Sequence, residues 1–568
     1  MKLKIVLTGL IFALTFSSCN DEMKYKEHTN YGKDYMELNF NNVSGLVADI
    51  YAKLDYDHGG DYGGAMLASA TDEAEYASES NVIHDFYNGA LSPVNATSAT
   101  WNNSYAAIQG CNHFLDNYLG LTFPELQFND DYLPQMFRYN NYENELRFLR
   151  AYFYFNLVRQ YGDVPFYTTE MNVDEINTLS RKPYKEIIDF IVQECDAIMN
   201  KIPVDYSNLG SMALPGSQDT GRATRLTVLA LKARALLYAA SPLFNTNNET
   251  SLWEKAASAN KAVLDSCAKY NRKLIAYTEI WGTNNWNSNE ALFVRRIGDL
   301  NNLESRNFPA GVEGGNSGNC PTQTLVDAYQ MQATGKFWNE SGSGYDPANP
   351  YEGRDPRFGM TVVKNGEEGW PFYNKLSIQT YLGGANGEPV AGATPTGYYL
   401  KKLLDKNVDF SSGRSTKTRH SWVTYRLGEF YLNYAEAVFK VLGSADATSS
   451  AYPMSAREAV NMVRSRAGVE MPALPTGLSN DEFWKQYTNE RMVELAFEGH
   501  RFWDVRRWKE ADKYFKSITR MKITKNSDDT YTYTRTTVNR QWDDKLYFFP
   551  IPQSERMKNT NLTQNQGY

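Results

Sequence analysis

Residues 489–509 read NERMVELAFEGHRFWDVRRWK, and this stretch combines an apolar stripe with dense charge. Apolar residues from Met492 to Trp503 recur every three or four positions, which is the spacing of one face of an α-helix. Gly499 interrupts the pattern and weakens a helix by about 1 kcal/mol relative to Ala, so another element is expected to pack closely against the backbone there. The stretch predicts one amphipathic helix.

The charged residues of this stretch form a second face of the predicted helix. Glu498 with Arg501, and Asp504 with Arg507, lie three positions apart and can pair on a helix surface. Glu494 and Glu498 have the spacing of two carboxylates on one face, which glycosidic acid–base chemistry would also use. Because the helix carries a continuous apolar stripe, an ion-paired structural surface is the favoured interpretation.

The same run resembles the C-terminal signature of the SusD/RagB family, which comprises glycan-binding outer-membrane lipoproteins of Bacteroidetes. The segment 549–568 at the end of the chain is similar to the family's terminus, and residues 145–152 match another of its patterns. The resemblance implies a mainly α fold, in which helical pairs of tetratricopeptide type stack into a superhelix and carry a large irregular insertion.

The N-terminus predicts export. Lys2 and Lys4 precede an apolar run over residues 5–16 that is too short to span a bilayer, as in a secretory signal peptide. The junction Ser-Ser-Cys at residues 17–19 resembles a lipobox, so residues 1–18 are predicted to be removed and Cys19 to be lipidated. The polar residues 19–35 are predicted to form a lipid-anchored tether.

Composition narrows the function classes. The chain has 568 residues and a net charge of −8, which disfavours nucleic-acid binding because phosphates require a basic surface. Beyond Cys19, the four cysteines are too widely spaced for a zinc site or a disulfide framework, and His500 has no His or Cys partner at ligand spacing. We expect no metal, no cofactor and no catalytic residue.

Residues 36–568 are predicted to form a single domain. Helical periodicity marks a frame over residues 36–269 and 421–568. A hairpin is expected over residues 522–539, because alternating Tyr and Thr residues follow the turn formers at 526–529. Between the two parts of the frame, residues 270–420 are rich in glycine, turn formers and aromatic rings without sustained periodicity. This insertion is expected to bind the ligand, because long loops on a rigid scaffold commonly carry recognition.

Glycan sites need exposed rings for stacking and planar polar groups that meet vicinal hydroxyls. Two regions offer both kinds of residue. The first is the early loop, over residues 55–95, with the start of the helix after it, where family members also place ligand contacts. The second is the insertion. The glycan-binding candidates are Asp57, Asp72, Glu73 and Trp101 in the first region, and Trp338, Arg354, Trp370, Tyr373, Tyr381 and Tyr399 in the second.

The resemblance implies a non-enzymatic protein at the cell surface, anchored in the outer membrane by lipid. It would capture an oligosaccharide or polysaccharide and deliver it to a SusC-like TonB-dependent transporter. Two alternatives stay open, a glycoside hydrolase with two carboxylates and a surface adhesin or scaffold that binds no soluble sugar.

Overall fold

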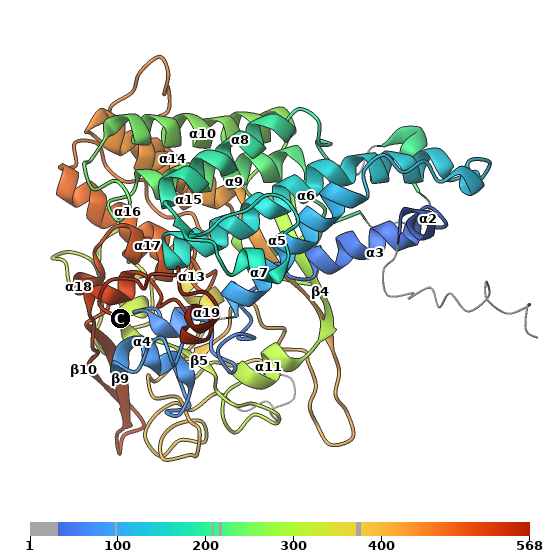
Figure 1. Ribbon diagram of the computed structural model, residues 1–568. Coiled ribbons are helices and arrows are strands. Elements are labelled where there is room, and N and C mark those ends of the chain that lie inside the picture. The colour runs from blue at the N-terminus through green and yellow to red at the C-terminus, as the bar shows by residue number, and fades with distance from the viewer. Residues whose placement is uncertain (1–31, 97–98, 207–208, 215–218, 284, 371–376) are drawn as a thin grey trace, which may run out of the picture.

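Figure 1 shows the computed structural model, which describes residues 32–96, 99–206, 209–214, 219–283, 285–370 and 377–568. The predicted signal peptide, Cys19 and Tyr373 lie outside these residues. The last residues of the predicted tether begin the short helix α2 (Lys33–Met36), so regular structure starts slightly before the expected boundary at residue 36. Within the described ranges, no helix has the length and apolar character that crossing a membrane requires.

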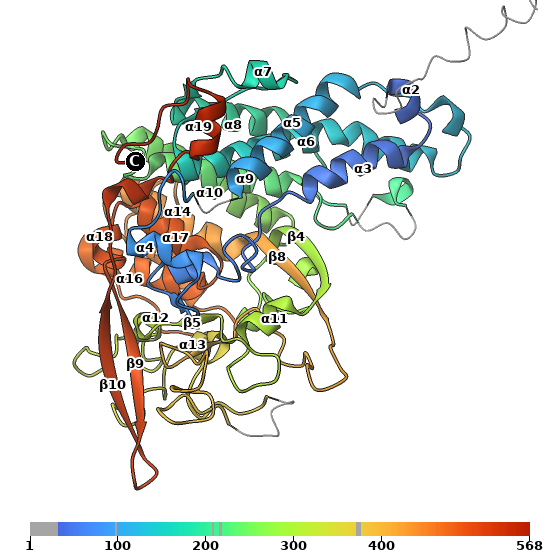
Figure 2. The same cartoon turned by 60° about the horizontal axis from the view of Figure 1, so that its bottom comes forward.

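Successive helices pack side by side in a layer that lies above the loop-rich part in Figures 1 and 2. Helices that neighbour each other in sequence make many of the contacts: α5 packs on α6, α8 on α9, α9 on α10 and α14 on α15, while α10 also packs on α14. The predicted helical frame is therefore confirmed. Its main members are α3 (Phe40–Tyr51), α5 (Thr100–Asn117), α6 (Tyr132–Tyr161), α8 (Tyr184–Ile198), α9 (Arg225–Ala240), α10 (Thr250–Lys269), α14 (Leu427–Leu442), α15 (Ala456–Arg464) and α16 (Asn480–Glu494).

Local signals set several helix ends. Thr224, Ser455 and Ser479 each cap a helix and form a reciprocal capping box with the residue three positions later. Helix α6 ends at Gly162, whose φ of 70° an L-residue rarely adopts. The same helix begins at Tyr132, and its first turns carry Tyr and Asn side chains rather than an aliphatic stripe.

The helix predicted over residues 489–509 is broken. Helix α16 ends at Glu494, and α17 (His500–Arg507) begins after a turn in which Phe497 and Gly499 have φ values of 60° and 75°. The prediction of one continuous helix is wrong, because the left-handed conformation at these two residues cannot continue an α-helix. The turn directs Glu498 toward Lys402 and Arg426, which lie in other parts of the chain.

The insertion contains one long sheet pairing that the sequence pattern did not reveal. Strand β4 (Ala291–Leu300) pairs antiparallel with β8 (Thr418–Arg426), with irregular register near Phe293 and Gly298. The expected boundary at residue 420 thus falls within a strand. Short elements complete the insertion: α11 (Asn302–Asn307), β5 (Asn319–Pro321), α12 (Gln323–Ala328), α13 (Arg357–Thr361), β6 (Val362–Val363) and β7 (Tyr399–Leu400).

The predicted hairpin is confirmed and projects from the lower end of the molecule in Figure 2. Strand β9 (Ser517–Lys525) pairs with β10 (Tyr531–Asn539) in continuous register, from Lys525 opposite Tyr531 to Ser517 opposite Asn539. The remaining short elements are α4 (Asp85–Asn88), α7 (Val173–Ile176), α18 (Ala511–Tyr514), α19 (Gln553–Lys558), and the strands β1 (Ala74–Tyr76), β2 (Val164–Pro165) and β3 (Arg181–Lys182), of which β1 pairs with β5 and β2 with β3.

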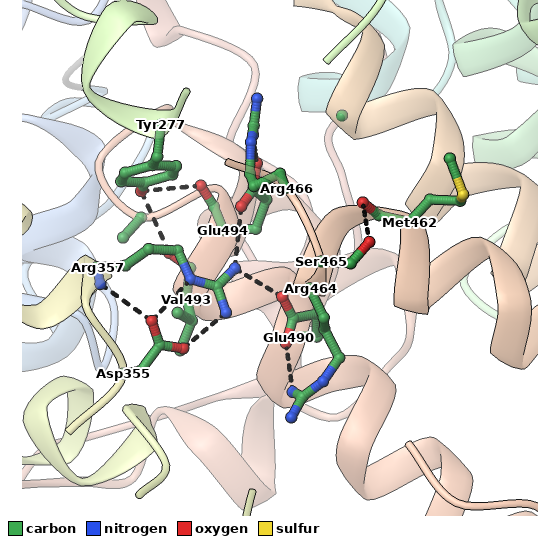
Figure 3. Close-up of polar contacts among 12 residues, drawn as sticks. Tyr277, Asp355, Arg357, Met462, Arg464, Ser465, Arg466, Glu490, Val493 and Glu494 are labelled. Atoms are coloured by element: carbon green, nitrogen blue, oxygen red, sulfur yellow. Dashed lines mark hydrogen bonds and ion pairs between the residues drawn. The ribbon is translucent and has the colours of Figure 1, made fainter. Parts of the chain in front are cut away.

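A buried group of charges, which we call the charged network, fastens the insertion to the frame, and Figure 3 shows the part of it around Glu490 and Glu494. Glu494 of α16 accepts from Arg357 at 2.9 Å and from Arg426 at 2.8 Å, and it also pairs with Arg466. In the network, five carboxylates balance five cations: Glu290, Asp355, Glu490, Glu494 and Glu498 with Arg357, Lys402, Arg426, Arg464 and Arg466. None of these ten side chains is more than 3% exposed.

The charged face of the signature is therefore ion-paired as predicted, but it lies in the interior rather than at the surface. Asp504 pairs with Arg507 at 2.9 Å, as the spacing suggested. The expected pair of Glu498 with Arg501 is wrong, because the helix break separates the two residues and Arg501 instead binds both carboxylate oxygens of Asp72. Since Glu494 and Glu498 are buried and paired with cations of the charged network, they do not form a glycosidic acid–base pair.

Four cysteines beyond Cys19 were expected to be packing residues, and the structure buries all of them as free thiols: Cys111, Cys195, Cys267 and Cys320.

Candidate functional site

The segment after α3 lines the main candidate site, which we call the Asp57 cleft. Two adjoining cavities of about 70 and 610 Å³ share Asp55, Tyr56, Asp61 and Thr100 in their walls. Helices α5 and α6 and strand β4 supply further parts of the wall. The turn between α16 and α17 closes the smaller cavity, so the broken signature helix borders the site.

Asp55 is held in place by donors on α6. Asn156 donates to its Oδ1 at 3.0 Å and Arg159 to its Oδ2 at 3.0 Å, while the Tyr152 hydroxyl also donates to Oδ1. The Arg159 guanidinium lies 4.6 Å from the centre of the Trp503 ring, which fixes its position from the other side. Asp55 is therefore a preoriented hydrogen-bond acceptor at the junction of the two cavities.

Arg295 and Tyr56 form another part of the wall, which is both charged and aromatic. The Arg295 guanidinium stacks over the Tyr56 ring at 4.2 Å, and it donates to the carbonyl oxygens of Ala52 (2.7 Å) and Leu54. These contacts bind strand β4 to the end of α3. A planar cation and an aromatic ring thus face the same space as the carboxylates, which is a combination suited to the hydroxyls and C–H faces of a sugar.

Asp57 has an unusual protonation equilibrium for a carboxylate. Burial raises its pKa from 3.8 to about 7, a single hydrogen bond from the Leu67 backbone N–H (2.9 Å) opposes the rise, and the charges of Asp61 and Asp55 add to it. Partial desolvation within the cleft also raises the pKa of Asp61. At neutral pH the cleft therefore holds a carboxyl group that can donate as well as accept a hydrogen bond.

His500 lies beside Asp57 in the smaller cavity. Burial, followed by the positive charges of Arg234 and Arg491, holds the pKa of its imidazole well below the ordinary value. The ring is therefore neutral at pH 7. Within the described part of the chain, no group of His, Cys, Asp and Glu residues could hold a metal ion.

Replacing Asp57 with Asn is expected to raise the free energy of unfolding at pH 8 by about 1–2 kcal/mol and to change it little at pH 4. The folded chain keeps the Asp57 proton up to about pH 7, whereas the ordinary value is 3.8. The stability that this group contributes is therefore full below pH 4 and is lost as the pH rises through 7. Urea unfolding of both proteins at pH 4, 6 and 8 measures the difference.

The matched control is Asp130→Asn, which removes an exposed carboxylate. It should leave the free energy of unfolding within about 0.5 kcal/mol of the wild-type value at each pH. A gain from Asp57→Asn that is equal at pH 4 and pH 8 would contradict the raised pKa.

Among the other candidates of the early loop, none lines the cleft. Asp72 is 2% exposed and is bound by Arg501, and Glu73 is 1% exposed. Trp101 is 5% exposed and meets the Tyr161 ring edge-on at a centroid distance of 5.1 Å. The helix that carries Trp101 turns its apolar face inward, which places this ring in the core, and Asp72 and Glu73 are likewise buried.

Three of the insertion candidates are also buried. Trp370 is 5% exposed and packs edge-on against Phe308 with the ring centres 4.8 Å apart. Arg354 donates to the backbone carbonyls of Pro350 and Tyr329 at 3.0 and 2.9 Å, and Tyr399 is fully buried. The structure thus overturns the exposure on which these three expectations depended, because the insertion forms cores of its own, although Trp370 also lines a separate cavity of about 350 Å³.

The two remaining described candidates lie along the hairpin and stay half-buried. Trp338 is covered by the Arg535 guanidinium at 3.8 Å, and Tyr381 lies 5.6 Å from the ring centre of Tyr531. The structure therefore separates the sequence candidates, and of those that it describes only Asp57 lies in the cleft.

Sequence reasoning missed most of the cleft. The run Asp55-Tyr56-Asp57 with Asp61 could have been found, because acids and an aromatic ring are concentrated in a glycine-rich loop. Arg295 carried no such signal, since it comes from a strand that was not predicted.

Two family models match separate parts of the chain. A family model described as the SusD family matches residues 283–568, and a second, described as starch-binding and associating with the outer membrane, matches residues 24–240. Two SusD-like proteins of Formosa agariphila are 23% identical over 451 residues and 25% identical over 499 residues. These alignments cover 73% and 83% of this chain and 70% and 80% of the relatives.

Solved structures share the fold over nearly the whole length. A SusD-like protein from Bacteroides fragilis superposes with a TM-score of 0.73 at 25% identity, covering 94% of this chain and 98% of the other. A SusD-like carbohydrate-binding protein from the same species gives 0.72 at 22% identity, covering 93% and 100%. A laminarin-binding SusD-like protein gives 0.62 at 22%, covering 93% and 98%. The predicted fold class is confirmed, and since the first family model spans half of the chain, this protein belongs to the SusD family.

Proposed function

We propose that the protein is a lipoprotein of the cell surface, anchored in the outer membrane through Cys19, that captures an oligosaccharide or polysaccharide. It would deliver the glycan to a SusC-like TonB-dependent transporter without chemical change. The Asp57 cleft carries this proposal: Asp55, Asp61, Arg295 and the Tyr56 ring converge on one space of about 610 Å³. Membership of a family that contains carbohydrate-binding proteins supports it.

The arrangement suits binding by hydroxyl recognition. Asp55 is fixed by Asn156 and Arg159, so its free lone pairs are aimed before a ligand arrives. Preorganisation of this kind reduces the entropy lost on binding. A glycan array on the lipid-free protein identifies the ligand, and calorimetry then gives its affinity.

Asp61→Ala is expected to weaken glycan binding about tenfold with an unchanged melting temperature. Asp61 is exposed at the cleft, so its loss removes a charged acceptor without opening a cavity in the core. Asp130→Ala, which removes an exposed carboxylate elsewhere, is the matched control and should bind as the wild type does. Equal affinities for the two variants would place the glycan outside the cleft.

The transporter partner is tested separately. Mild detergent extraction of the outer membrane should recover the protein together with a large TonB-dependent barrel. Recovery of the protein alone, under conditions that keep other such complexes intact, would count against delivery while leaving glycan binding unaffected.

A second candidate function, glycoside hydrolysis, is favoured by one observation. Asp57, with a pKa near 7, shares the cleft with Asp55, and hydrolysis uses one protonated and one ionised carboxyl group. Incubation with the glycan found on the array distinguishes the two functions. Release of reducing ends that Asp57→Asn abolishes would establish an enzyme, whereas binding without release supports delivery.

A further inference from the structure

A second concave region, which we call the Trp281 groove, lies within the insertion. Two adjoining cavities of about 280 and 350 Å³ share Trp281, Leu403, Leu404 and Asp405 in their walls. Half of the shared wall is therefore aliphatic, and the Trp281 ring is half-buried between the two cavities. Met360 and Trp370 add apolar surface to the larger cavity, whereas polar side chains such as Thr283 and Ser421 line most of the smaller one. A concave site that combines apolar rings with a few placed polar groups is a usual form of a small-molecule site.

A wall of aromatic side chains separates the groove from the Asp57 cleft. The His58 ring lies edge-on to Trp422 at 5.4 Å and to His420 at 5.7 Å, and all three side chains are at least nine-tenths buried. His58 and His420 face the groove, whereas Trp422 borders the cleft. The two sites are therefore neighbours that do not share a lining residue.

The groove contains features that packing alone does not explain. Leu403 has a φ of 74°, a strained conformation for a residue with a Cβ that typically costs about 1 kcal/mol or more. Trp281 Nε1, Asn285 Oδ1 and Ser421 Oγ are buried without a hydrogen-bond partner among the described residues. A buried polar atom without a partner is destabilising, so a ligand hydroxyl that reached one after a small side-chain rotation would recover stability.

Charges around the groove are nearly balanced. Lys401 pairs with Glu367 at 2.6 Å, and the buried Lys402 pairs with Glu498 at 3.0 Å while its Nζ lies 4.1 Å from the Trp281 ring centre. Glu368 and Asp405 offset the exposed Lys406 at the mouth, and Arg419, which also lines the groove, lies 3.5 Å from the carboxylate of Asp299. The groove therefore has no excess of cations to attract a uronate or a sulfated sugar, and its chemistry favours a neutral ligand.

We propose that the Trp281 groove is a second carbohydrate site that takes one neutral hexose unit, with Trp281 as its aromatic wall and Asp405 as a hydroxyl acceptor. This inference rests on the proposed glycan-binding function. The hexose unit is either part of a chain that is also held in the Asp57 cleft or part of a separate saccharide.

The probes are glucose, galactose and mannose as neutral hexoses and glucuronate as the charged analogue. The protein is labelled with 5-fluorotryptophan, and the resonance of Trp281 among the 11 tryptophans is assigned by its absence in Trp281→Phe. We expect at least one neutral hexose to shift the Trp281 resonance in a saturable manner and glucuronate to bind about tenfold more weakly.

A blocking variant keeps the test independent of folding. Thr283 is exposed and lines the groove, so Thr283→Trp fills it without altering the core and should weaken the hexose response about tenfold or more. Thr536→Trp, at an exposed position on β10, is the matched control and should respond as the wild type does. A Trp281 resonance that none of the three neutral hexoses moves overturns the inference, as does a response that Thr283→Trp leaves intact.

Asp61→Ala distinguishes the two sources of the hexose unit and separates this inference from the proposed function. If the unit belongs to a chain held in the cleft, Asp61→Ala weakens the Trp281 response to an oligosaccharide from the array but not to the free hexose. If the saccharide is separate, both responses persist. Glycan binding that depends on Asp61, with a Trp281 resonance that stays unmoved, would sustain the proposed function and refute the second site.

Discussion

Replacing Glu494 with Ala is expected to lower the free energy of unfolding by about 3–5 kcal/mol. Glu494 is fully buried and pairs with Arg357, Arg426 and Arg466, so its loss leaves five buried cations of the charged network against four carboxylates. Breaking a buried ion pair from one side is costly because the remaining charge keeps its desolvation penalty. Chemical denaturation of the purified variant measures the change.

The control for this substitution is Glu186→Ala on α8. Glu186 also forms an ion pair, with Lys182 at 2.7 Å, but its side chain is 54% exposed. A surface pair of this kind contributes about 1 kcal/mol at most, so the control should remain close to the wild type. Similar losses for the two variants would show that burial of the network is not what makes Glu494 important.

The same carboxylate should make the fold acid-sensitive. Burial alone would raise the pKa of Glu494, but the charges of Arg466, Arg426 and Arg357 outweigh burial and lower the pKa from 4.5 to about 2. A depressed pKa contributes stability that is full above pH 4.5 and is lost as the pH falls toward 2. The free energy of unfolding of the wild type should therefore fall across this window more steeply than that of Glu494→Ala.

Replacing Gly428 with Ala is expected to lower the free energy of unfolding by about 1–3 kcal/mol, although it adds only one methyl group. Gly428 lies in the first turn of α14, and a Cβ there would overlap Arg426 Nη1 and come within 3.0 Å of Glu290 and 3.2 Å of Glu494. The methyl group would push apart ion pairs that cannot be resolvated. Thermal and urea unfolding measure the loss.

Gly45→Ala supplies a control of opposite sign. Gly45 lies inside α3, and a Cβ there would meet nothing within 4 Å. Ala stabilises a helix interior by about 1 kcal/mol relative to Gly, so this variant should be more stable than the wild type. A Gly428→Ala protein that gains stability in the same way would show that the network tolerates the methyl group.

The amino-acid sequence was sufficient to predict most helices of the frame, because helix formation depends on residues within a few turns of one another. Thr224 caps α9 and Gly162 ends α6 through contacts that are local in the chain. The hairpin of β9 and β10 is also set locally, since its turn lies between the alternating strands. The signature of residues 489–509 and the match at the C-terminus were sufficient to predict membership of the SusD family.

The candidate site was decided by the tertiary structure. Asp57 was predicted, but Arg295 reaches the cleft because β4 pairs with β8 across more than a hundred residues. The residue pattern within β4 does not identify β8 as its partner strand, because the pairing also depends on the residues of that distant strand. The exposure of aromatic rings could not be predicted from the sequence for the same reason. Trp338 and Trp370 look alike in the sequence, yet Trp338 is half-buried at the hairpin and Trp370 is packed against Phe308.

The charged network shows the physical reason most clearly. In the sequence, Glu490 and Glu494 have the pattern of a solvated helix face, because charge is costly to bury and is usually at the surface. Their burial is possible only because Arg357, Arg426, Arg464 and Arg466 converge on them from three other segments and replace the lost hydration. Local periodicity therefore determined which residues form helices, whereas partners distant in the chain determined which charges are buried and where a ligand can bind.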